Sequence, residues 1–386
     1  MAADELLVWR KEFPSLDAGG VHLISHSLGA VPKQTAEYLG QFAEEWASKS
    51  ITAWETWFPE IGRAGDRIAK LLGAPAGSVT MHQNVSTVEA VVASCLDYTP
   101  GGRDGVVYSD MNFPTVSYVW QAEQRRGARV TVVKSDGVGV DADKLCAAID
   151  ERTLIVPISH VLFRSSFVKD VAKIVKRAHE VGAMVLLDCY QSLGTLPFDV
   201  TALGVDMACG GSVKWLCGGP GAAYLYVRPD LIPKFSPRVT GWIGHEKPFA
   251  FTMPEQHYAP GIMRYLGGTP AIIALYQSRA GHELIAEIGV DKIRAKSLRQ
   301  TRRLIEWVDD QGFTLRSPRE DARRGGTVCF ELEGSGEIAA ELNRRQFYCD
   351  HRPMAGIRVS PHFYTKDEEL DLFQKEVERL RPPSRM

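Results

Sequence analysis

Residues 183–188 read AMVLLD, a short apolar run that ends in a single acid. Apolar residues without alternation fit a strand that is buried on both faces, as in a parallel sheet covered by helices. The run before it, KDVAKIVKRAHEV at 169–181, has the spacing of an amphipathic helix. A helix followed by a buried strand is the repeating unit of α/β folds. This short stretch therefore predicts an α/β protein.

The alternation of strands and helices continues upstream of this stretch. Strands are predicted at 78–81, 105–108, 128–133 and 153–158, and helices at 60–72, 86–97, 114–126 and 141–149. Chains in which strands and helices alternate form parallel sheets with helices on both sides. We therefore expect a mainly parallel sheet covered by helices on both faces.

The pattern changes near residue 230. The segment 232–262 is rich in Pro, Gly and aromatic residues, which indicates a long ordered loop. A helical stretch at about 270–311 follows it, and then come strands near 327–332 and 356–360 and helices near 336–346 and 366–381. We expect an N-terminal segment at 1–30, a large domain at 31–262 and a smaller C-terminal α/β domain at 263–386.

The composition is ordinary for a globular protein. Its formal net charge of −2 is not typical of a protein that binds nucleic acid or an anionic membrane. No apolar stretch approaches the length of a membrane helix, and the start MAADELLVWRKEF lacks the features of a signal peptide. The seven Cys are scattered without CxxC spacing, so neither a disulfide framework nor a metal site is expected. We expect a cytoplasmic protein.

Two residues carry candidate chemistry, because ligands of an open α/β sheet bind outside the carboxyl ends of its strands. Asp188 ends the strand at 183–188, and a buried acid is costly unless a cation meets it. It either caps a helix or pairs with a protonated ring nitrogen. Lys214 lies among small and apolar residues, which favour its neutral, nucleophilic amine. The alternative for Lys214 is a surface lysine in a Gly-rich turn.

Ser86 and Thr87 are predicted to open the helix at 86–97. Ser86 and Glu89 have the spacing of a capping box. The same helix start offers free backbone N–H groups and the positive end of the helix dipole, which suit a phosphate. Capping and phosphate binding are both open for these residues.

Together these features match the demands of pyridoxal 5′-phosphate (PLP). This cofactor needs a lysine for a Schiff base, an acid at its ring nitrogen, a ring-stacking partner and a phosphate cradle. Lys214, Asp188, Phe113 and the helix start at Ser86 and Thr87 meet these needs. The sequence contains no P-loop, GxGxxG, HExxH or GxSxG motif that would favour another chemistry.

Several segments of the chain are similar to those of one enzyme group. They are HSLGAVP at 26–32, NFPT at 112–115, DCYQSLGTLPFDVTALGVD at 188–206, GGSVKWLCGGPG at 210–221, GWIGH at 241–245, RYLGGTP at 264–270 and RVSPHFYT at 358–365. On these segments the chain resembles the fold-type I PLP enzymes of the class V aminotransferase group, and within that group the kynureninases. The fold implied is a large PLP-binding domain with a smaller C-terminal domain.

The resemblance implies roles for the matching residues. Lys214 holds PLP covalently and moves the substrate's Cα proton, and Asp188 pairs with the pyridine nitrogen. The implied cofactor contacts are completed by Phe113 at the ring face, Gln191 at the ring oxygen, and Ser86, Thr87, Ser212 and Trp242 at the phosphate. Thr269 is implied to come from the second subunit of a homodimer with shared active sites.

The resemblance also implies a small-molecule substrate with an α-carboxylate. Arg358 is expected to hold that carboxylate with bidentate geometry, which suits a guanidinium. Ser27 and His26 are expected beside the substrate, and His26 stands where kynureninases usually have Asn.

Three positions depart from the kynureninase pattern. Gln191 stands where kynureninases have His, and it is similar to cysteine desulfurases, in which Gln bonds the cofactor's ring oxygen. Val213 replaces a Tyr that serves phosphate binding and proton transfer, and Val116 replaces an Asp. Val offers neither a proton nor a hydrogen bond.

We expect a PLP-dependent enzyme that acts on an amino acid. The first choice is kynureninase-like cleavage of the β side chain, which is hydrolytic where the substrate bears a γ-carbonyl. The alternatives within the class V group are transamination, C–S lysis and epimerisation. An alternative of another kind is a catalytically inactive PLP-fold protein that acts as a binding module.

Overall fold

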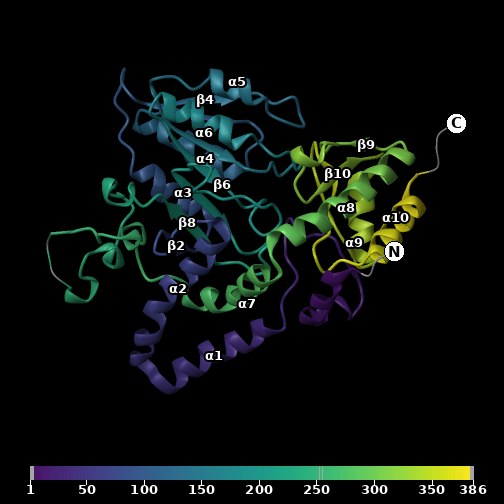
Figure 1. Ribbon diagram of the computed structural model, residues 1–386, viewed down its shortest axis with the longest axis horizontal. Coiled ribbons are helices and arrows are strands. Elements are labelled where there is room, and N and C mark those ends of the chain that lie inside the picture. Colours follow the sequence, from purple (N-terminus) through teal and green to yellow (C-terminus); the bar gives the residue numbers. More distant parts are fainter. Residues whose placement is uncertain (1–3, 252, 254, 383–386) are drawn as a thin grey trace.

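The computed structural model describes residues 4–251, 253 and 255–382 of the chain. A seven-stranded sheet forms the centre of the larger of two lobes (Figure 1). Its strands, in spatial order, are β2 (Val79–His82), β8 (Ala223–Val227), β7 (Met207–Gly211), β6 (Met184–Asp188), β5 (Thr153–Ser159), β3 (Gly105–Ser109) and β4 (Arg129–Val133). Neighbouring strands run parallel except at β8, which is antiparallel to both β2 and β7. The predicted mainly parallel sheet is confirmed.

Helices cover both faces of this sheet, because successive side chains of a strand point to opposite sides. Val185 and Leu187 of β6 belong to one hydrophobic core, and Leu186 between them belongs to the other. The first core is closed by α2 (Trp54–Leu72), α5 (Ala142–Ala147), α6 (Val171–Glu180) and α7 (Ile272–Ile288), and the second by α3 (Val85–Ser94) and α4 (Pro114–Ala122). Burial on both sides explains why residues 183–188 show no polar alternation.

The smaller lobe contains a four-stranded antiparallel sheet and a third hydrophobic core. Its strands, in spatial order, are β12 (Asp350–Arg352), β13 (Gly356–Val359), β10 (Val328–Glu331) and β9 (Thr314–Leu315). The helices α8 (Val290–Asp310), α9 (Ser335–Arg344) and α10 (Asp367–Leu380) pack against them. In Figure 1 these elements lie together beside the larger lobe.

The helical stretch predicted at 270–311 is two helices that meet at Gly289. This residue has φ 88°, in the region that glycine adopts without strain. Helix α7 packs into the core of the large lobe and against α1 (Gln34–Lys49), whereas the second half of α8 packs into the small lobe. Because α7 belongs to the core of the large lobe, we propose that the large domain extends to Gly289 rather than ending at residue 262.

The N-terminal residues lie against the small lobe. Strand β1 (Val21–His22) pairs in parallel with β11 (Phe347–Tyr348), and Ile24 forms a bridge with Ser360. The next residues turn toward the large lobe, since the backbone N–H of Gly29 donates to the carbonyl of Val213 at 2.8 Å. No helix in the described ranges is both long and apolar enough to span a lipid bilayer.

The start of α3 differs from the sequence prediction. The N-cap is Asn84, whose side-chain oxygen accepts from the backbone N–H of Thr87 at 2.9 Å. The predicted capping box of Ser86 and Glu89 is wrong, because Glu89 points into the protein and accepts from the indole of Trp120 at 2.5 Å. Asn is among the preferred N-cap residues, and here it stands two positions before Ser86.

Candidate active site

A cavity of about 240 Å³ lies at the carboxyl edge of the large sheet. Ser159 and Asp188, the last residues of β5 and β6, are paired in register at this edge, and α3 begins beside them. The cavity is lined by Asn84, Val85, Ser86, Phe113, Thr115, Val116, Ser159, Val161, Phe163, Asp188, Tyr190, Gln191 and Lys214. This is the place where open α/β sheets bind their ligands.

Asp188 is fixed at the base of the cavity. One carboxylate oxygen accepts from the backbone N–H of Tyr190 at 2.9 Å, and the other accepts from the hydroxyl of Ser159 at 3.2 Å. Burial raises the pKa of Asp188, and the hydrogen bonds and the cations of Lys214 and Lys169 oppose that shift. The carboxylate therefore gains from a further cationic partner inside the cavity.

Lys214 places its amine between two aromatic rings. Its Nζ atom lies 4.3 Å from the ring centroid of Tyr190 and 5.5 Å from that of Phe113. Burial lowers the pKa of Lys214 to about 8, although the charge of Asp188 acts in the opposite direction. About a tenth of the amine is then neutral at pH 7, and this form is the nucleophile.

The Gly-rich segment around Lys214 allows a close turn. The backbone N–H of Gly218 donates to the carbonyl of Ser212 at 2.8 Å, and a Cβ atom at residue 218 would lie 2.7 Å from that of Ser212. Gly29 approaches the other side, where a Cβ atom would lie 2.2 Å from the carbonyl oxygen of Lys214. Glycine is therefore required at both positions for the chain to fold around Lys214.

The start of α3 forms one end of the cavity. Val85 and Ser86 stand in the first turn, where backbone N–H groups have no partner within the helix. The hydroxyl groups of Ser86 and Thr115 lie 3.0 Å apart at the same end. These donors and the helix dipole suit a phosphate group.

The other residues predicted at the cofactor, Thr269 of the second subunit among them, lie outside the cavity lining of a single chain. The hydroxyl of Thr87 donates to Asn84 at 3.1 Å. The hydroxyl of Ser212 is buried, donates to the carbonyl of Ala222 at 2.8 Å and lies 2.8 Å from His282 Nε2. Trp242 packs against Phe249 and Phe251 in the aromatic loop, and Thr269 is exposed. A single chain therefore does not bring Thr87, Ser212, Trp242 and Thr269 into the cavity.

Gln191 presents a donor to the cavity, because its amide orientation is fixed from two sides. The indole N–H of Trp215 donates to Gln191 Oε1 at 2.9 Å, and Gln191 Nε2 donates to the backbone carbonyl of His26 at 3.0 Å. An indole N–H can only donate and a carbonyl can only accept, so the amide cannot be reversed. The second N–H of Nε2 remains available to a ligand.

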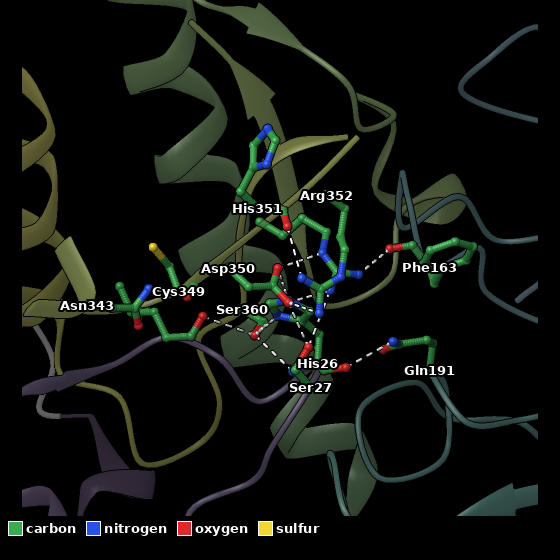
Figure 2. A network of polar contacts seen from close by, with 12 residues as sticks. His26, Ser27, Phe163, Gln191, Asn343, Cys349, Asp350, His351, Arg352 and Ser360 are labelled. Atoms are coloured by element: carbon green, nitrogen blue, oxygen red, sulfur yellow. Dashed lines mark hydrogen bonds and ion pairs between the residues drawn. The ribbon is translucent and has the colours of Figure 1, made fainter. Parts of the chain in front are cut away.

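Arg358 already binds a carboxylate of the protein, that of Asp350. Figure 2 shows the polar network around Asp350, with His26 and Ser27 beside it. Asp350 accepts from Arg358 Nε at 2.7 Å and from Nη2 at 2.6 Å, so the pair is bidentate and buried. Arg358 Nη1 donates to the carbonyl of Phe163 at 2.7 Å, and Nη2 also lies 3.3 Å from the hydroxyl of Ser27. Of the five N–H groups of the guanidinium, one has no partner among the residues that the structure describes. A bidentate grip on a substrate carboxylate therefore requires Arg358 to release one of these partners.

His26 and Ser27 bind Asp350 rather than facing the cavity. His26 Nε2 lies 3.0 Å from one carboxylate oxygen, and the hydroxyl of Ser27 donates to the other at 2.9 Å. Burial and the charge of Arg358 lower the pKa of His26 to about 4, so the ring is neutral at pH 7. Burial acts to raise the pKa of Asp350, but its bonds with His26 and Arg358 hold it well below the usual range.

Lys169 is a buried cation that the sequence analysis did not single out. Its Nζ atom donates to the hydroxyl of Ser109 and to Asn112 Oδ1, both at 2.9 Å. Burial lowers the pKa of Lys169 to about 7, opposed by the charge of Asp188. The lysine precedes α6, whose N-cap is Asp170. A lysine at a helix N-terminus is unfavourable next to the positive end of the helix dipole. This unfavourable position is the sequence feature from which Lys169 could have been singled out.

Each group in the cavity has a counterpart on PLP. The cavity offers an amine, a buried carboxylate, two aromatic rings, an amide donor and a cluster of donors at a helix start. PLP presents an aldehyde, a basic ring nitrogen, a flat ring, a ring oxygen and a phosphate. The donor set therefore fits the cofactor that the sequence predicts.

Comparison with known proteins agrees with this fit. A family model described as Aminotransferase class-V matches residues 25–373. The chain is 32% identical over 363 residues to the uncharacterized aminotransferase YcbU of Bacillus subtilis (strain 168), with 94% of each chain covered. It is 33% identical over 362 residues to the kynureninase of Pseudomonas fluorescens, which covers 89% of this chain and 84% of that enzyme.

Two solved structures share the fold over nearly the whole chain. The apo cysteine desulfurase from Thermococcus onnurineus NA1 superposes with a TM-score of 0.86 at 21% identity, and 96% of each chain is covered. The cystine C–S lyase C-DES, solved with its product cysteine persulfide, also has a TM-score of 0.86, at 22% identity over 96% of this chain and 100% of the other. At these identities the likeness concerns the fold.

Proposed function

This chain belongs to the class V aminotransferase family of PLP-dependent enzymes, and we propose that within the family it cleaves the β side chain of an amino acid, as kynureninases do. Where the substrate bears a γ-carbonyl, the cleavage is hydrolytic. The observation that carries the proposal is the arrangement of a partly neutral Lys214 amine and a buried Asp188 in one cavity. The match to kynureninases over about nine-tenths of the chain supports this branch of the family.

Bound PLP supplies an aldehyde for the amino group and an electron sink for the charge that develops at the substrate's Cα. Lys214 removes the Cα proton and returns it, because its amine is neutral in part near pH 7. Asp188 holds the ring nitrogen in its protonated form through its charge. Phe113, which lines the cavity, would contact the ring face of bound PLP, and Gln191, whose amide is oriented by Trp215, would donate to the ring oxygen.

Arg358 holds the substrate carboxylate from the side of the small lobe. Its charge is balanced by Asp350, and the nearby Arg352 adds a second guanidinium 3.2 Å from the same carboxylate. The two arginines and one aspartate leave a net positive cluster, which favours a substrate with a carboxylate. Both arginines lower the pKa of Lys214, so their charges are felt at the amine.

Transamination is the second candidate. It is supported by the similarity to a relative named as an aminotransferase over 94% of both chains. Transamination also does not depend on the Tyr that kynureninases carry immediately before the lysine. Here that position is Val213, whose side chain can transfer no proton.

The two candidates are separated by a product screen. Purified enzyme with PLP is incubated with amino acids, including kynurenine, with and without an α-keto acid, and products are identified by mass spectrometry. Release of alanine without a keto acid supports side-chain cleavage. Turnover that depends on the keto acid contradicts it and supports transamination.

A further inference from the structure

Tyr190 is a cavity residue whose side chain ends in a hydroxyl group. The residue lines the cavity, and its backbone N–H donates to Asp188. Among residues 4–251, 253 and 255–382, nothing forms a hydrogen bond with the hydroxyl itself. Burial raises the pKa of Tyr190 to about 12, so the group stays protonated and can donate at neutral pH.

Gly211 makes room for this hydroxyl. A Cβ atom at residue 211 would lie 2.5 Å from the hydroxyl oxygen of Tyr190, closer than any side chain allows. Gly211 is the last residue of β7 and stands three positions before Lys214. The absence of a side chain at this position therefore leaves space for the phenol hydroxyl beside the end of β7.

The strand register places the hydroxyl on the side of the cavity that α3 bounds. Gly211 pairs with Ala223 of β8, and Ala223 pairs in turn with His82, the last residue of β2. Helix α3 is capped by Asn84, two residues after His82. Neighbouring strands lie about 4.8 Å apart, so Gly211 is about 10 Å from the end of β2. Since the hydroxyl lies against Gly211 of β7, it is nearer across the strands to the start of α3 than Asp188 of β6 is.

We propose that Tyr190 donates a hydrogen bond from its hydroxyl to the phosphate of bound PLP. The inference rests on the family's cofactor and adds a ligand from this chain. A phosphate accepts several charge-assisted hydrogen bonds. The start of α3 and Thr115 supply donors from one side, whereas Ser212 is tied to Ala222 and His282 and Val213 has none to give. Tyr190 supplies a donor from the side of β7.

The test compares two ligands that differ only in the phosphate. PLP and pyridoxal, which lacks the phosphate, are titrated into cofactor-free full-length enzyme and followed by absorbance. Tyr190→Phe removes only the hydroxyl, and Tyr224→Phe is the control. Tyr224 is also buried with an unpaired hydroxyl, which lies against Gly210, but it does not line the cavity. Thermal unfolding of each cofactor-free variant is measured first.

We expect Tyr190→Phe to raise the Kd of PLP about tenfold or more, since a hydrogen bond to a charged group is lost. The Kd of pyridoxal should change less than about twofold, and Tyr224→Phe should change neither. The phosphorus-31 resonance of bound PLP should shift in Tyr190→Phe alone. Equal weakening of PLP and pyridoxal, or an unchanged Kd for PLP, overturns the role of Tyr190. A wild-type chain that binds no PLP contradicts the cofactor as well.

Discussion

Two buried charge neighbourhoods of this molecule differ in how completely they are paired. Arg358 and Asp350 in the small lobe make two direct hydrogen bonds, and further donors surround the carboxylate. Lys214 and Asp188 in the large lobe share one cavity, but in the described ranges no hydrogen bond joins them and the amine has no acceptor. The saturated pair holds its atoms in place. The unsaturated pair keeps its groups available for a ligand.

The pKa values follow the same division. Direct hydrogen bonds and the neighbouring charge keep Asp350 ionised in spite of burial. Burial dominates at Asp188 and Lys214, so each is shifted toward its neutral form. Groups that lack a partner in the protein are therefore the ones prepared to accept one from a cofactor.

The largest effect is expected from removal of the unpaired amine. Lys214→Ala should abolish the visible absorbance of covalently bound PLP and lower activity at least about a thousandfold, because the nucleophile and the proton carrier are lost together. Lys134→Ala, an exposed lysine beside Asp110, is the control and should behave as wild type. A variant at Lys214 with an unchanged spectrum would remove this residue from the site.

Loss of the acid should cost less than loss of the amine. Asp188→Ala should retain some cofactor and lose activity roughly 100- to 1000-fold, because a charged group that stabilises the transition state is missing. Steady-state kinetics and the absorbance of the bound cofactor measure the two effects separately. Full activity in this variant would show that Asp188 does not control the charge of the ring.

The paired neighbourhood should respond in the stability of the fold. Asp350→Ala should lower the free energy of unfolding by about 3 kcal/mol, because Arg358 is left buried without a counter-charge. Urea unfolding measures the change. Asp309→Ala, which breaks an exposed pair with Arg319, should cost less than about 1 kcal/mol. Equal costs for the two variants would contradict the difference between buried and exposed pairs.

The unpaired amine should also show a pH dependence. The rate at which PLP attaches to cofactor-free enzyme should rise about tenfold per pH unit below the pKa of Lys214, about 8, and level off above it, since only the neutral amine reacts. Asp188→Asn removes the charge that raises this pKa, so the midpoint should move to lower pH. An unchanged midpoint in Asp188→Asn would show that the charge of Asp188 does not influence the pKa of Lys214.

The smallest effect is expected at Gln191, which lines the cavity of Lys214 and Asp188 and donates to the carbonyl of His26 beside Asp350. Trp215→Phe should lower turnover about fivefold, because the indole N–H no longer donates to Gln191 Oε1 and the amide is less firmly oriented. Trp57→Phe is the matched control, since Trp57 is buried and its indole donates to Glu45. In a Gln191→Leu background the Trp215 change should have no further effect. A fivefold loss there would show that Trp215 does not act through Gln191.

Much of the fold follows from the sequence, because buried parallel strands carry a strong apolar signal. The strand that ends in Asp188 and the helix at 169–181 were predicted within a few residues of the observed bounds. The strands β7 and β8 on either side of Lys214 were not predicted, since Gly, Ala and Cys dilute the apolar pattern in the first. Tertiary burial decides such segments more than propensity does.

The candidate site was predictable where strand ends imply position, and less so where side-chain direction matters. Lys214 and Asp188 were predicted and share the cavity. Ser212 is adjacent in sequence to the residues of the Lys214 turn, but its hydroxyl turns toward His282, which no sequence spacing reveals. Asp350 and Lys169 bind residues far away in the chain, so only the tertiary structure shows their partners.

The N-terminal segment has a mechanical consequence. Its strand β1 is paired with β11 of the small lobe, and a few residues later Gly29 is bonded to the carbonyl that precedes Lys214. The short segment between β1 and Gly29 therefore connects the small lobe to the turn that carries Lys214. A rotation of the small lobe would therefore displace the turn that carries Lys214. A domain fused ahead of residue 20 would act on the same turn through β1 and Gly29.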